Sequence, residues 1–190
     1  MPQTPQPRVT REEYLALEER SDTRHQFYAG EVFAMTGGTF RHAAIAGNVY
    51  LALGTRLHGR PCRPMNSDMR VHTPSGLDTY PDVSLLCGEP ELADDQRTLL
   101  NPVALFEVLS PSTAGFDRGD KFLHYRSIPG LRDYVLVDSE RVRVEHFRRG
   151  DADGEWVLRE HTDPEAAVDL AATGCRLPLA EVYGGIALEE

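Results

Sequence analysis

Hydrophobic and polar positions follow two different periods along this chain, and each change of period marks a new element. A capping-box pattern at residues 10–13 predicts a short helix over 11–19. Apolar residues at helical spacing predict a longer helix over 39–57. Between these helices, residues 25–35 have the pattern of two short strands around a turn at residues 29–30. The first third of the chain is therefore expected to hold a helix, a hairpin and a second helix.

Beyond the second helix the pattern changes to short runs typical of strands. Residues 103–109 are almost all apolar, which is typical of a central strand covered on both faces. Asp117 and Asp120 are expected to cap a helix over 118–127, and residues 88–100 are expected to form an acidic loop. The remaining predicted elements are strands over 61–65, 68–73, 81–87, 133–138, 141–147, 155–161 and 167–170 and a short helix over 178–184.

This order of elements predicts an α/β or α+β fold, in which helices flank a mixed β-sheet behind an N-terminal helix and hairpin. Three prolines within residues 1–9 predict a flexible arm, and no linker or internal repeat divides residues 10–190. We therefore expect one domain over 10–190. With 190 residues, 41% of them apolar and 26% charged, the chain is large enough to bury a core and is not a disordered protein.

The sequence also restricts the compartment that we expect. No run approaches the roughly 18 apolar residues that span a bilayer, and the first residues lack the apolar segment of a signal peptide. We therefore expect a cytoplasmic protein without a membrane partner. Cys62, Cys87 and Cys175 are too few and too scattered for a disulfide framework or a zinc site. They are expected to be small core residues in a reducing compartment.

The charge of the chain is acidic and uneven. A net charge of −10 argues against a protein that coats nucleic acid, because such a protein needs a basic surface. Of the 20 basic residues, 19 are arginine and one, Lys121, is lysine. A lysine ammonium is compact and its pKa moves readily, whereas a guanidinium stays charged. Lys121 is therefore either a leftover surface residue or a residue with a chemical role.

Two carboxylates stand out because of the strands in which they lie. Glu107 has apolar neighbours on both sides in the predicted central strand, where an unpaired carboxylate is very costly. It must find a cation, a donor or a proton, and a buried ion pair with an arginine is the structural alternative. Asp82 begins the apolar strand 81–87 and shares a face with Ser84. Its structural alternative is an aspartate that binds the backbone where the strand begins.

Lys121 lies early in the helix that follows the Glu107 strand. Tyr125 lies one turn later on the same face of that helix. An exposed pair between Lys121 and Asp117, four residues apart, is the structural alternative and contributes only a few tenths of a kcal/mol. A helix that packs back on the sheet instead brings the ammonium to the carboxylates.

Together, these residue types indicate a particular chemistry. Two carboxylates on neighbouring strands can hold Mg²⁺ or Mn²⁺, which prefer oxygen ligands and keep several waters. A bound metal lowers the pKa of water, and a nearby lysine can orient that water or stabilise the developing oxyanion. Asp82, Glu107 and Lys121 are therefore sufficient for metal-assisted hydrolysis of a phosphodiester.

Several motifs resemble those of one family. They are Tyr-Pro-Asp-Val-Ser at 80–84, Phe-Glu-Val-Leu-Ser-Pro-Ser-Thr at 106–113, Asp-Lys-Phe-Leu-His-Tyr at 120–125, Asp-Tyr-Val-Leu-Val-Asp at 133–138 and an earlier match over 24–38. Over residues 10–185 the chain resembles the Uma-type restriction endonucleases of the PD-(D/E)XK nuclease superfamily. The resemblance implies a restriction-endonuclease-like fold with DNA as substrate. It also implies that Asp82 and Glu107 bind Mg²⁺ or Mn²⁺ and that Lys121 is the catalytic lysine.

Two positions depart from the patterns of these nucleases. Leu109 stands two residues after the acid, where the superfamily places its lysine, and the family's usual replacement is a lysine on the following helix. Lys121 occupies that place. Gln26 stands where family members commonly have an acid before the Gly-Glu turn, which removes one candidate metal ligand.

Three further residues are candidates for the site. Glu31 and Asp68 are extra carboxylates, with a turn residue and a surface pair with Arg70 as their structural alternatives. His42, at the start of the long helix, either contacts the site or a phosphate or is a packing histidine.

The leading hypothesis is a metal-dependent endonuclease acting on DNA. A non-catalytic module that binds nucleic acid or protein and retains the fold is the first alternative, because fold does not imply function. A phosphodiesterase acting on RNA or nucleotides is the second, since the same metal site serves both substrates. Cleavage of both strands of a duplex usually takes two active sites, so a homodimer is the expected assembly.

Overall fold

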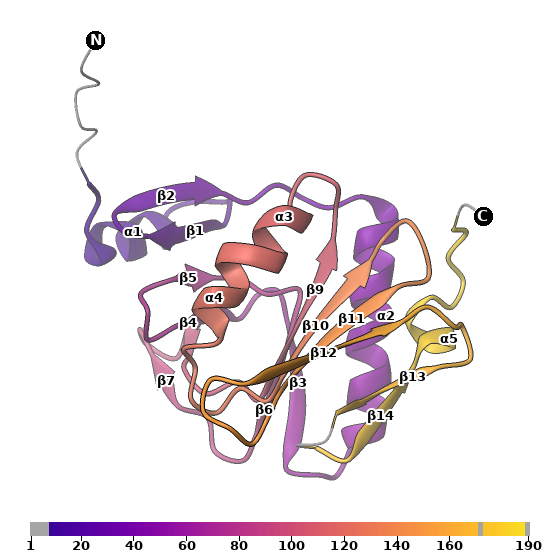
Figure 1. Ribbon diagram of the computed structural model, residues 1–190. Helices are drawn as coiled ribbons and strands as arrows, with labels where there is room; N and C mark the ends of the chain where they lie inside the picture. Colours follow the sequence, from indigo (N-terminus) through magenta and orange to yellow (C-terminus); the bar gives the residue numbers. More distant parts are fainter. Residues whose placement is uncertain (1–7, 171–172, 189–190) are drawn as a thin grey trace.

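The computed structural model describes residues 8–170 and 173–188 (Figure 1). The helical elements are α1 (Arg11–Glu18), α2 (Phe40–Leu57), α3 (Ala114–Phe116), the π-helical segment η1 (Asp117–Lys121), α4 (Phe122–Tyr125) and α5 (Leu179–Val182). The strands are β1 (His25–Tyr28), β2 (Glu31–Ala34), β3 (Cys62–Asn66), β4 (Arg70–His72), β5 (Asp78–Thr79), β6 (Val83–Cys87), β7 (Leu92–Ala93), β8 (Thr98–Leu99), β9 (Ala104–Leu109), β10 (Asp133–Asp138), β11 (Val144–Arg149), β12 (Trp156–His161), β13 (Ala167–Leu170) and β14 (Cys175–Pro178).

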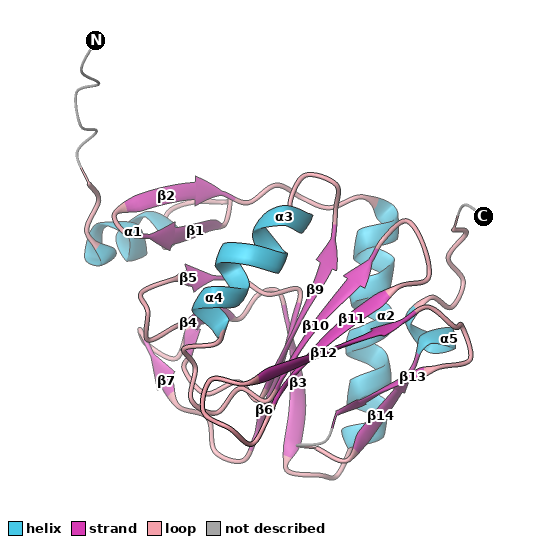
Figure 2. Cartoon of the chain, in the orientation of Figure 1, coloured by secondary structure: helices cyan, strands magenta, loops and turns pink. Residues whose placement is uncertain are grey.

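The strands form two six-stranded sheets and a separate hairpin of β13 and β14 (Figure 2). One sheet has the order β2-β1-β5-β4-β8-β7, and the other has the order β12-β11-β10-β9-β6-β3. Both are mixed, because β4 and β8 run parallel, as do β9 and β10, while the other neighbours are antiparallel. Strands β9 and β10 lie in the middle of the second sheet and are buried along their whole length, as the apolar run 103–109 predicts.

Hydrophobic cores cover both faces of the second sheet. Alternate residues of β9 enter different cores, since successive side chains of a strand point to opposite faces. Phe106 and Val108 pack in the core that contains α2, α5 and the β13–β14 hairpin. Leu105 and Leu109 pack in the core that contains Tyr125 of α4 (Figure 1). The sheet is therefore flanked by helices on both sides, and none of the described helices is both long and apolar enough to cross a membrane.

The predicted N-terminal elements are confirmed in detail. The Thr10 hydroxyl accepts from the backbone N–H of Glu13, and the Glu13 carboxylate accepts from the N–H of Thr10 at 2.8 Å, which completes the capping box. The hairpin turns at Ala29 and Gly30, both with positive φ, of 51° and 86°. Most of the predicted arm, residues 1–7, lies outside the described residues, whereas the N–H of Val9 donates to the Gly30 carbonyl at 3.0 Å.

The helix after β9 begins earlier than predicted, and its expected caps are wrong. The N–H of Ala114 already donates to the Ser110 carbonyl at 2.9 Å, so the first turn forms soon after the strand ends. Asp117 and Asp120 consequently lie inside the helical segment rather than before it. Asp117 is buried, which no capping position requires.

The π-helical segment aligns three side chains with the sheet. An α-helix has 3.6 residues per turn, so two residues four positions apart are separated by slightly more than one turn. Side chains at every fourth position therefore rotate gradually around the helix axis in one direction. A π-helical turn holds more residues, so a spacing of four is slightly less than one turn there. The rotation then has the opposite direction and offsets that of the α-helix. Segment η1 followed by α4 therefore keeps Asp117, Lys121 and Tyr125 on one buried face.

Several strand boundaries also differ from the prediction. Strands β7 and β8 lie within the predicted loop 88–100, and β5 and β14 were not predicted. Strands of two residues are too short to show a period, so the sequence pattern carries no signal for β5, β7 and β8. Strand β11 begins at Val144 rather than at residue 141, because the intervening residues connect it to β10.

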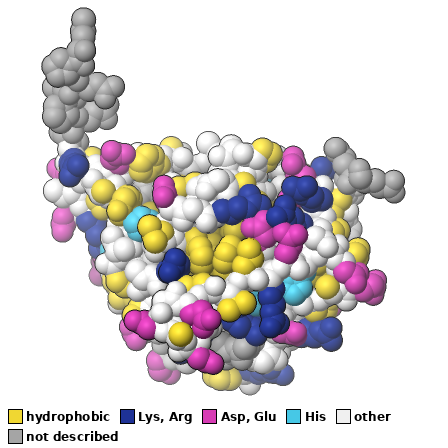
Figure 3. All heavy atoms as spheres, viewed as in Figure 1, with side chains coloured by type: hydrophobic (Ala, Val, Ile, Leu, Met, Phe, Trp, Pro, Cys, Tyr) yellow, Lys and Arg dark blue, Asp and Glu magenta, His cyan; other side chains and the backbone are white. Residues whose placement is uncertain are grey.

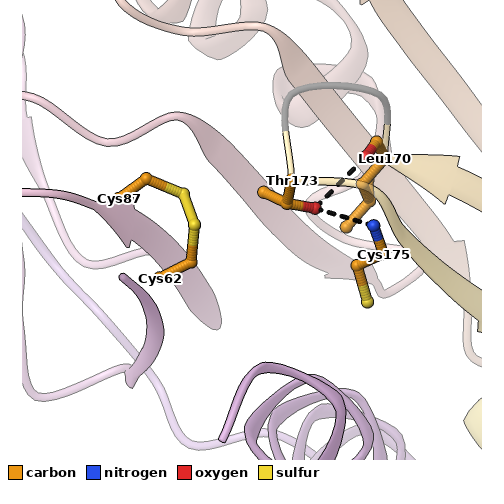
Figure 4. Close-up of a disulfide and its surroundings, with 5 residues drawn as sticks. All are labelled: Cys62, Cys87, Leu170, Thr173 and Cys175. Carbon is orange, nitrogen blue, oxygen red and sulfur yellow. Dashed lines mark hydrogen bonds between the residues drawn. A yellow bond between two sulfur atoms is a disulfide. The ribbon is translucent and has the colours of Figure 1, made fainter. Parts of the chain in front are cut away.

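The expectation of three reduced cysteines is wrong for two of them. Cys62 of β3 lies directly opposite Cys87 of β6, and a disulfide joins them (Figure 4). Their Cα atoms are 4.0 Å apart. The pairing depends on the register of two strands that are 25 residues apart in sequence, which cysteine spacing alone does not reveal. Cys175 is free and buried, as expected.

Reduction of this disulfide is expected to lower the free energy of unfolding by about 3 kcal/mol, because the unfolded chain regains the freedom of the closed loop. Urea denaturation with and without dithiothreitol measures the difference. The variant with Cys62→Ser and Cys87→Ser is the matched control and is expected to show no response to dithiothreitol. An equal loss of stability in both proteins would contradict the role of the disulfide.

Candidate active site

The antiparallel register of β6 and β9 places two carboxylates side by side. Val83 pairs with Phe106, so Asp82, one residue before β6, lies opposite Glu107. Residues directly opposite each other in such a pair point to the same face of the sheet. The carboxylate of Asp82 is also fixed to β9, since its Oδ2 accepts from the backbone N–H of Val108 at 2.7 Å.

Lys121 reaches this pair from the helix that crosses the same face. Its Nζ lies 2.8 Å from Oε1 of Glu107 and 3.2 Å from Oδ1 of Asp117. The hydroxyl of Tyr125 donates to the same Oε1 of Glu107 at 2.7 Å. The side chains of Lys121 and Glu107 are only 6% and 5% exposed, so this is a buried network and not the exposed pair that was the alternative.

The protonation states follow from burial and charge. Burial raises the pKa of Glu107 to about 8, although the Lys121 ammonium acts in the opposite direction. Burial alone lowers the pKa of Lys121, but Glu107 and Asp117 outweigh it and hold this pKa above its usual value. Lys121 is therefore an ammonium at neutral pH and acts as a donor. Burial also raises the pKa of Tyr125, which stays a neutral phenol and a donor.

His42 contacts Asp82 on the side of the site that faces the cleft. It lies in the first turn of α2, with Nε2 3.3 Å from Oδ2 of Asp82. The hydrogen bond to Asp82 raises the pKa of His42, so the imidazole holds its proton to higher pH than usual. Both side chains line a cleft of about 710 Å³ between the start of α2, the loop before it and the β3–β4 turn. Asp82 is therefore reachable from solvent through this cleft, whereas Glu107 does not line it.

Gly38 is required for the position of His42. A Cβ atom added at Gly38 would lie 2.6 Å from Nδ1 of the His42 ring. We expect Gly38→Ala to push the imidazole away from Asp82 and to lower the His42 pKa toward its ordinary value. An NMR titration of the histidine ring protons measures this shift. Gly37→Ala is the matched control, because a Cβ there meets no atom within 4 Å. An unchanged His42 pKa in Gly38→Ala would contradict this account.

The two carboxylates have the donors that a magnesium or manganese ion needs. Each uses one oxygen for the contacts above, and Oδ1 of Asp82 and Oε2 of Glu107 accept no hydrogen bond from the described residues. Oxygen ligands from two carboxylates, completed by water, suit both ions. In the part of the chain that the structure describes, no group of three or more His, Cys, Asp or Glu is arranged to hold a metal. The fit thus rests on this pair alone.

The other two candidate carboxylates lie apart from the pair. Glu31 is an exposed residue of β2, and none of its described contacts reaches the site. Asp68 is exposed in the β3–β4 turn and pairs with Arg24, not with Arg70 as the sequence alternative proposed. Gln26 accepts from the Thr79 hydroxyl at 3.4 Å and likewise makes no contact with the pair.

Two features of the site were only partly visible in the sequence. Leu109 lies on the same face as Glu107 and is buried in the core with Tyr125, so the ammonium comes from the helix instead. The sequence predicts Asp117 to be a helix cap or an exposed partner of Lys121. Its spacing of four residues from the only lysine indicates the pair, and the structure shows that the pair is buried.

The similarity of this chain to known proteins shows the family to which it belongs. Residues 11–180 match the model of the Uma2 family, which is described as "Putative restriction endonuclease". The chain belongs to the Uma2 family. Two Synechocystis proteins are similar to this Uma2 chain. "Uncharacterized protein slr1290" is 33% identical over 98% of this chain and 97% of its own length, and "Uncharacterized protein sll1609" is 34% identical over 86% and 93%.

A solved structure has the same fold as this Uma2 chain. It is described as "a putative nuclease belonging to DUF820" from Anabaena variabilis, with a TM-score of 0.70 and 17% identity. The match covers 89% of this chain and 96% of that one. The predicted class, a mixed sheet flanked by helices, is confirmed. Family membership, which confirms the resemblance seen in the sequence, supports a nuclease function for this chain.

Proposed function

We propose that this Uma2 chain is a metal-dependent endonuclease that hydrolyses phosphodiester bonds of DNA. One observation carries the proposal: the only lysine of the sequence reaches Glu107 at 2.8 Å, on the sheet face that Asp82 shares. Two carboxylates beside an ammonium, one of them lining an open cleft, suit stabilisation of the charge that develops on a phosphodiester.

In this proposal Asp82 and Glu107 hold Mg²⁺ or Mn²⁺ through the oxygens that make no hydrogen bond. When bound, the ion supplies positive charge and lowers the pKa of a coordinated water. Tyr125 and the Val108 N–H each donate to one carboxylate oxygen and keep the two carboxylates in place. This preorganisation reduces the rearrangement needed during the reaction.

Lys121 is proposed to act as a donor to the attacking water. An ammonium has three N–H donors, and Glu107 and Asp117 account for two of them. The third remains to orient the water and to stabilise negative charge in the transition state. His42, which keeps its proton because of Asp82, is proposed to donate to a phosphate oxygen in the cleft.

The purified protein incubated with supercoiled plasmid tests the function. Nicked or linear plasmid is expected with Mg²⁺ or Mn²⁺ and not with EDTA. A parallel reaction with labelled RNA tests the alternative of an RNA phosphodiesterase. Turnover of neither substrate with either metal would contradict the endonuclease.

A non-catalytic binding module is the second candidate, and one observation favours it. Lys121 already satisfies both Glu107 and Asp117, as a buried structural ion pair would. This candidate predicts nucleic-acid or protein binding without turnover. For the endonuclease and for the binding module alike, a homodimer remains a prediction. Sedimentation equilibrium tests it directly.

A further inference from the structure

The cleft that leads to Asp82 has a floor shaped by one face of α2. Ala43, Ala46 and Gly47 line it, so no long side chain fills the space between His42 and Tyr50. His42 and Tyr50 are eight residues apart, which places them about 12 Å from each other along the helix axis. The cleft therefore has a polar end at His42 and Asp82 and an aromatic end at Tyr50.

Tyr50 is the aromatic side chain of this cleft that is available to a ligand. It is 42% exposed, and none of the hydrogen bonds of the described residues uses its hydroxyl. Tyr80 also lines the cleft, but it is 9% exposed, its ring faces the Arg24 guanidinium, and its hydroxyl donates to Glu18 at 2.6 Å. A half-exposed ring beside an open floor is suited to stacking on a nucleobase.

The charges of the cleft are unsuited to a duplex. Arg24 is the one lysine or arginine among the described lining residues, and its guanidinium already binds Asp68 and the Ser67 carbonyl. Asp22 and Asp82 add negative charge to the same walls. Figure 3 shows one face of the molecule, on which basic and acidic side chains are interspersed without forming a continuous basic band. Duplex binding draws most of its affinity from neutralised phosphates, which this cleft does not provide.

The size of the cleft also argues against a duplex as its ligand. About 710 Å³ is within the range of pockets that enclose a small-molecule ligand. A flexible unpaired strand can place one nucleotide in such a space, whereas a duplex is a stiff rod that holds each base in its stack.

We propose that this site acts on unpaired nucleic acid, with a base next to the scissile phosphate stacked on Tyr50. The inference rests on the proposed nuclease function, because it assigns the substrate class of the same site. Nicking of a supercoiled plasmid is compatible with it, since negative supercoiling favours local separation of the strands. Because the one arginine of the described lining is already paired, few phosphates are neutralised, so affinity is expected to depend on stacking and hydrogen bonds and only weakly on salt.

Fluorescence anisotropy with a labelled oligothymidylate, free or annealed to oligodeoxyadenylate, tests the proposal in EDTA. We expect the single strand to bind about ten-fold more tightly than the duplex and Tyr50→Ala to remove most of that difference. Tyr50→Phe keeps the ring and is expected to bind like the wild type. Leu51→Ala is the matched control, because Leu51 is 67% exposed on the same helix but does not line the cleft.

Equal binding of both forms, a steep dependence on salt, or the same loss in Leu51→Ala and Tyr50→Ala would overturn the proposal. Cleavage assays of the same two substrates with Mg²⁺ separate it from the proposed function. Cleavage of the duplex without any effect of Tyr50→Ala refutes the substrate class and leaves the nuclease intact. Binding of the single strand through Tyr50 without cleavage refutes the nuclease and supports the cleft as a site for unpaired strands.

Discussion

Lys121→Met is expected to abolish metal-dependent cleavage and to lower the free energy of unfolding by about 3 kcal/mol. The loss of activity follows from the missing donor beside the attacking water. The loss of stability follows because Glu107 and Asp117 remain buried without the cation that both contact. Plasmid nicking measures the first effect and urea denaturation the second.

Two further variants make this prediction specific. Asp117→Asn added to Lys121→Met is expected to recover part of the stability, since it removes one uncompensated charge, but none of the activity. Arg118→Met is the matched control, because Arg118 lies on the same π-helical segment and is 37% exposed, and its buried partner Glu145 keeps a second cation in Arg143. It is expected to retain cleavage and to lose no more than about 1 kcal/mol. Cleavage by Lys121→Met at the wild-type rate would contradict the role of the lysine.

Asp82→Asn and Glu107→Gln are each expected to weaken Mn²⁺ binding at least about ten-fold, because each removes one charged ligand from a pair. Both amides keep the shape of the carboxylate, and the amide of the Asp82→Asn variant retains an oxygen that can accept from the Val108 N–H. Isothermal titration calorimetry measures the affinity. The titration is best made above pH 8, where the Glu107 carboxyl has lost its proton.

The remaining candidate carboxylates provide the controls for metal binding. Glu31→Gln and Asp68→Asn each remove one negative charge from exposed positions outside the carboxylate pair. Both are expected to bind Mn²⁺ like the wild type. A loss of affinity in these variants that matches the loss in Asp82→Asn would place the metal elsewhere or show only a general charge effect.

The sequence predicts well those elements that have a long run of apolar or periodic residues, or a local motif such as a capping box or a turn. The capping box at Thr10, the turn at Ala29 and Gly30 and the apolar run of β9 all appear where expected. Features that depend on pairing between distant segments were not predictable. The partition of the strands into two six-stranded sheets and the disulfide between β3 and β6 both result from strand register, which single-sequence patterns do not encode.

The candidate site shows the same division. Glu107 was conspicuous because a carboxylate in an apolar strand needs a partner, and Lys121 was conspicuous because it is the only lysine. Their contact depends on where the helix after β9 begins and on its π-helical segment, neither of which the sequence pattern revealed. As a result, the sequence predicts Asp117 as a cap before the helix, whereas it lies within the helical segment and its buried carboxylate contacts the ammonium.

The burial of this lysine makes the folded protein almost inert to reagents that modify ε-amines. Lys121 is the only side chain of the sequence that carries such an amine, and it is 6% exposed. Acylation of this amine therefore requires the helical segment to open, so its rate follows the population of the opened state. A single mass increment on Lys121 then counts the molecules that have opened at the candidate site, without a label or a substitution.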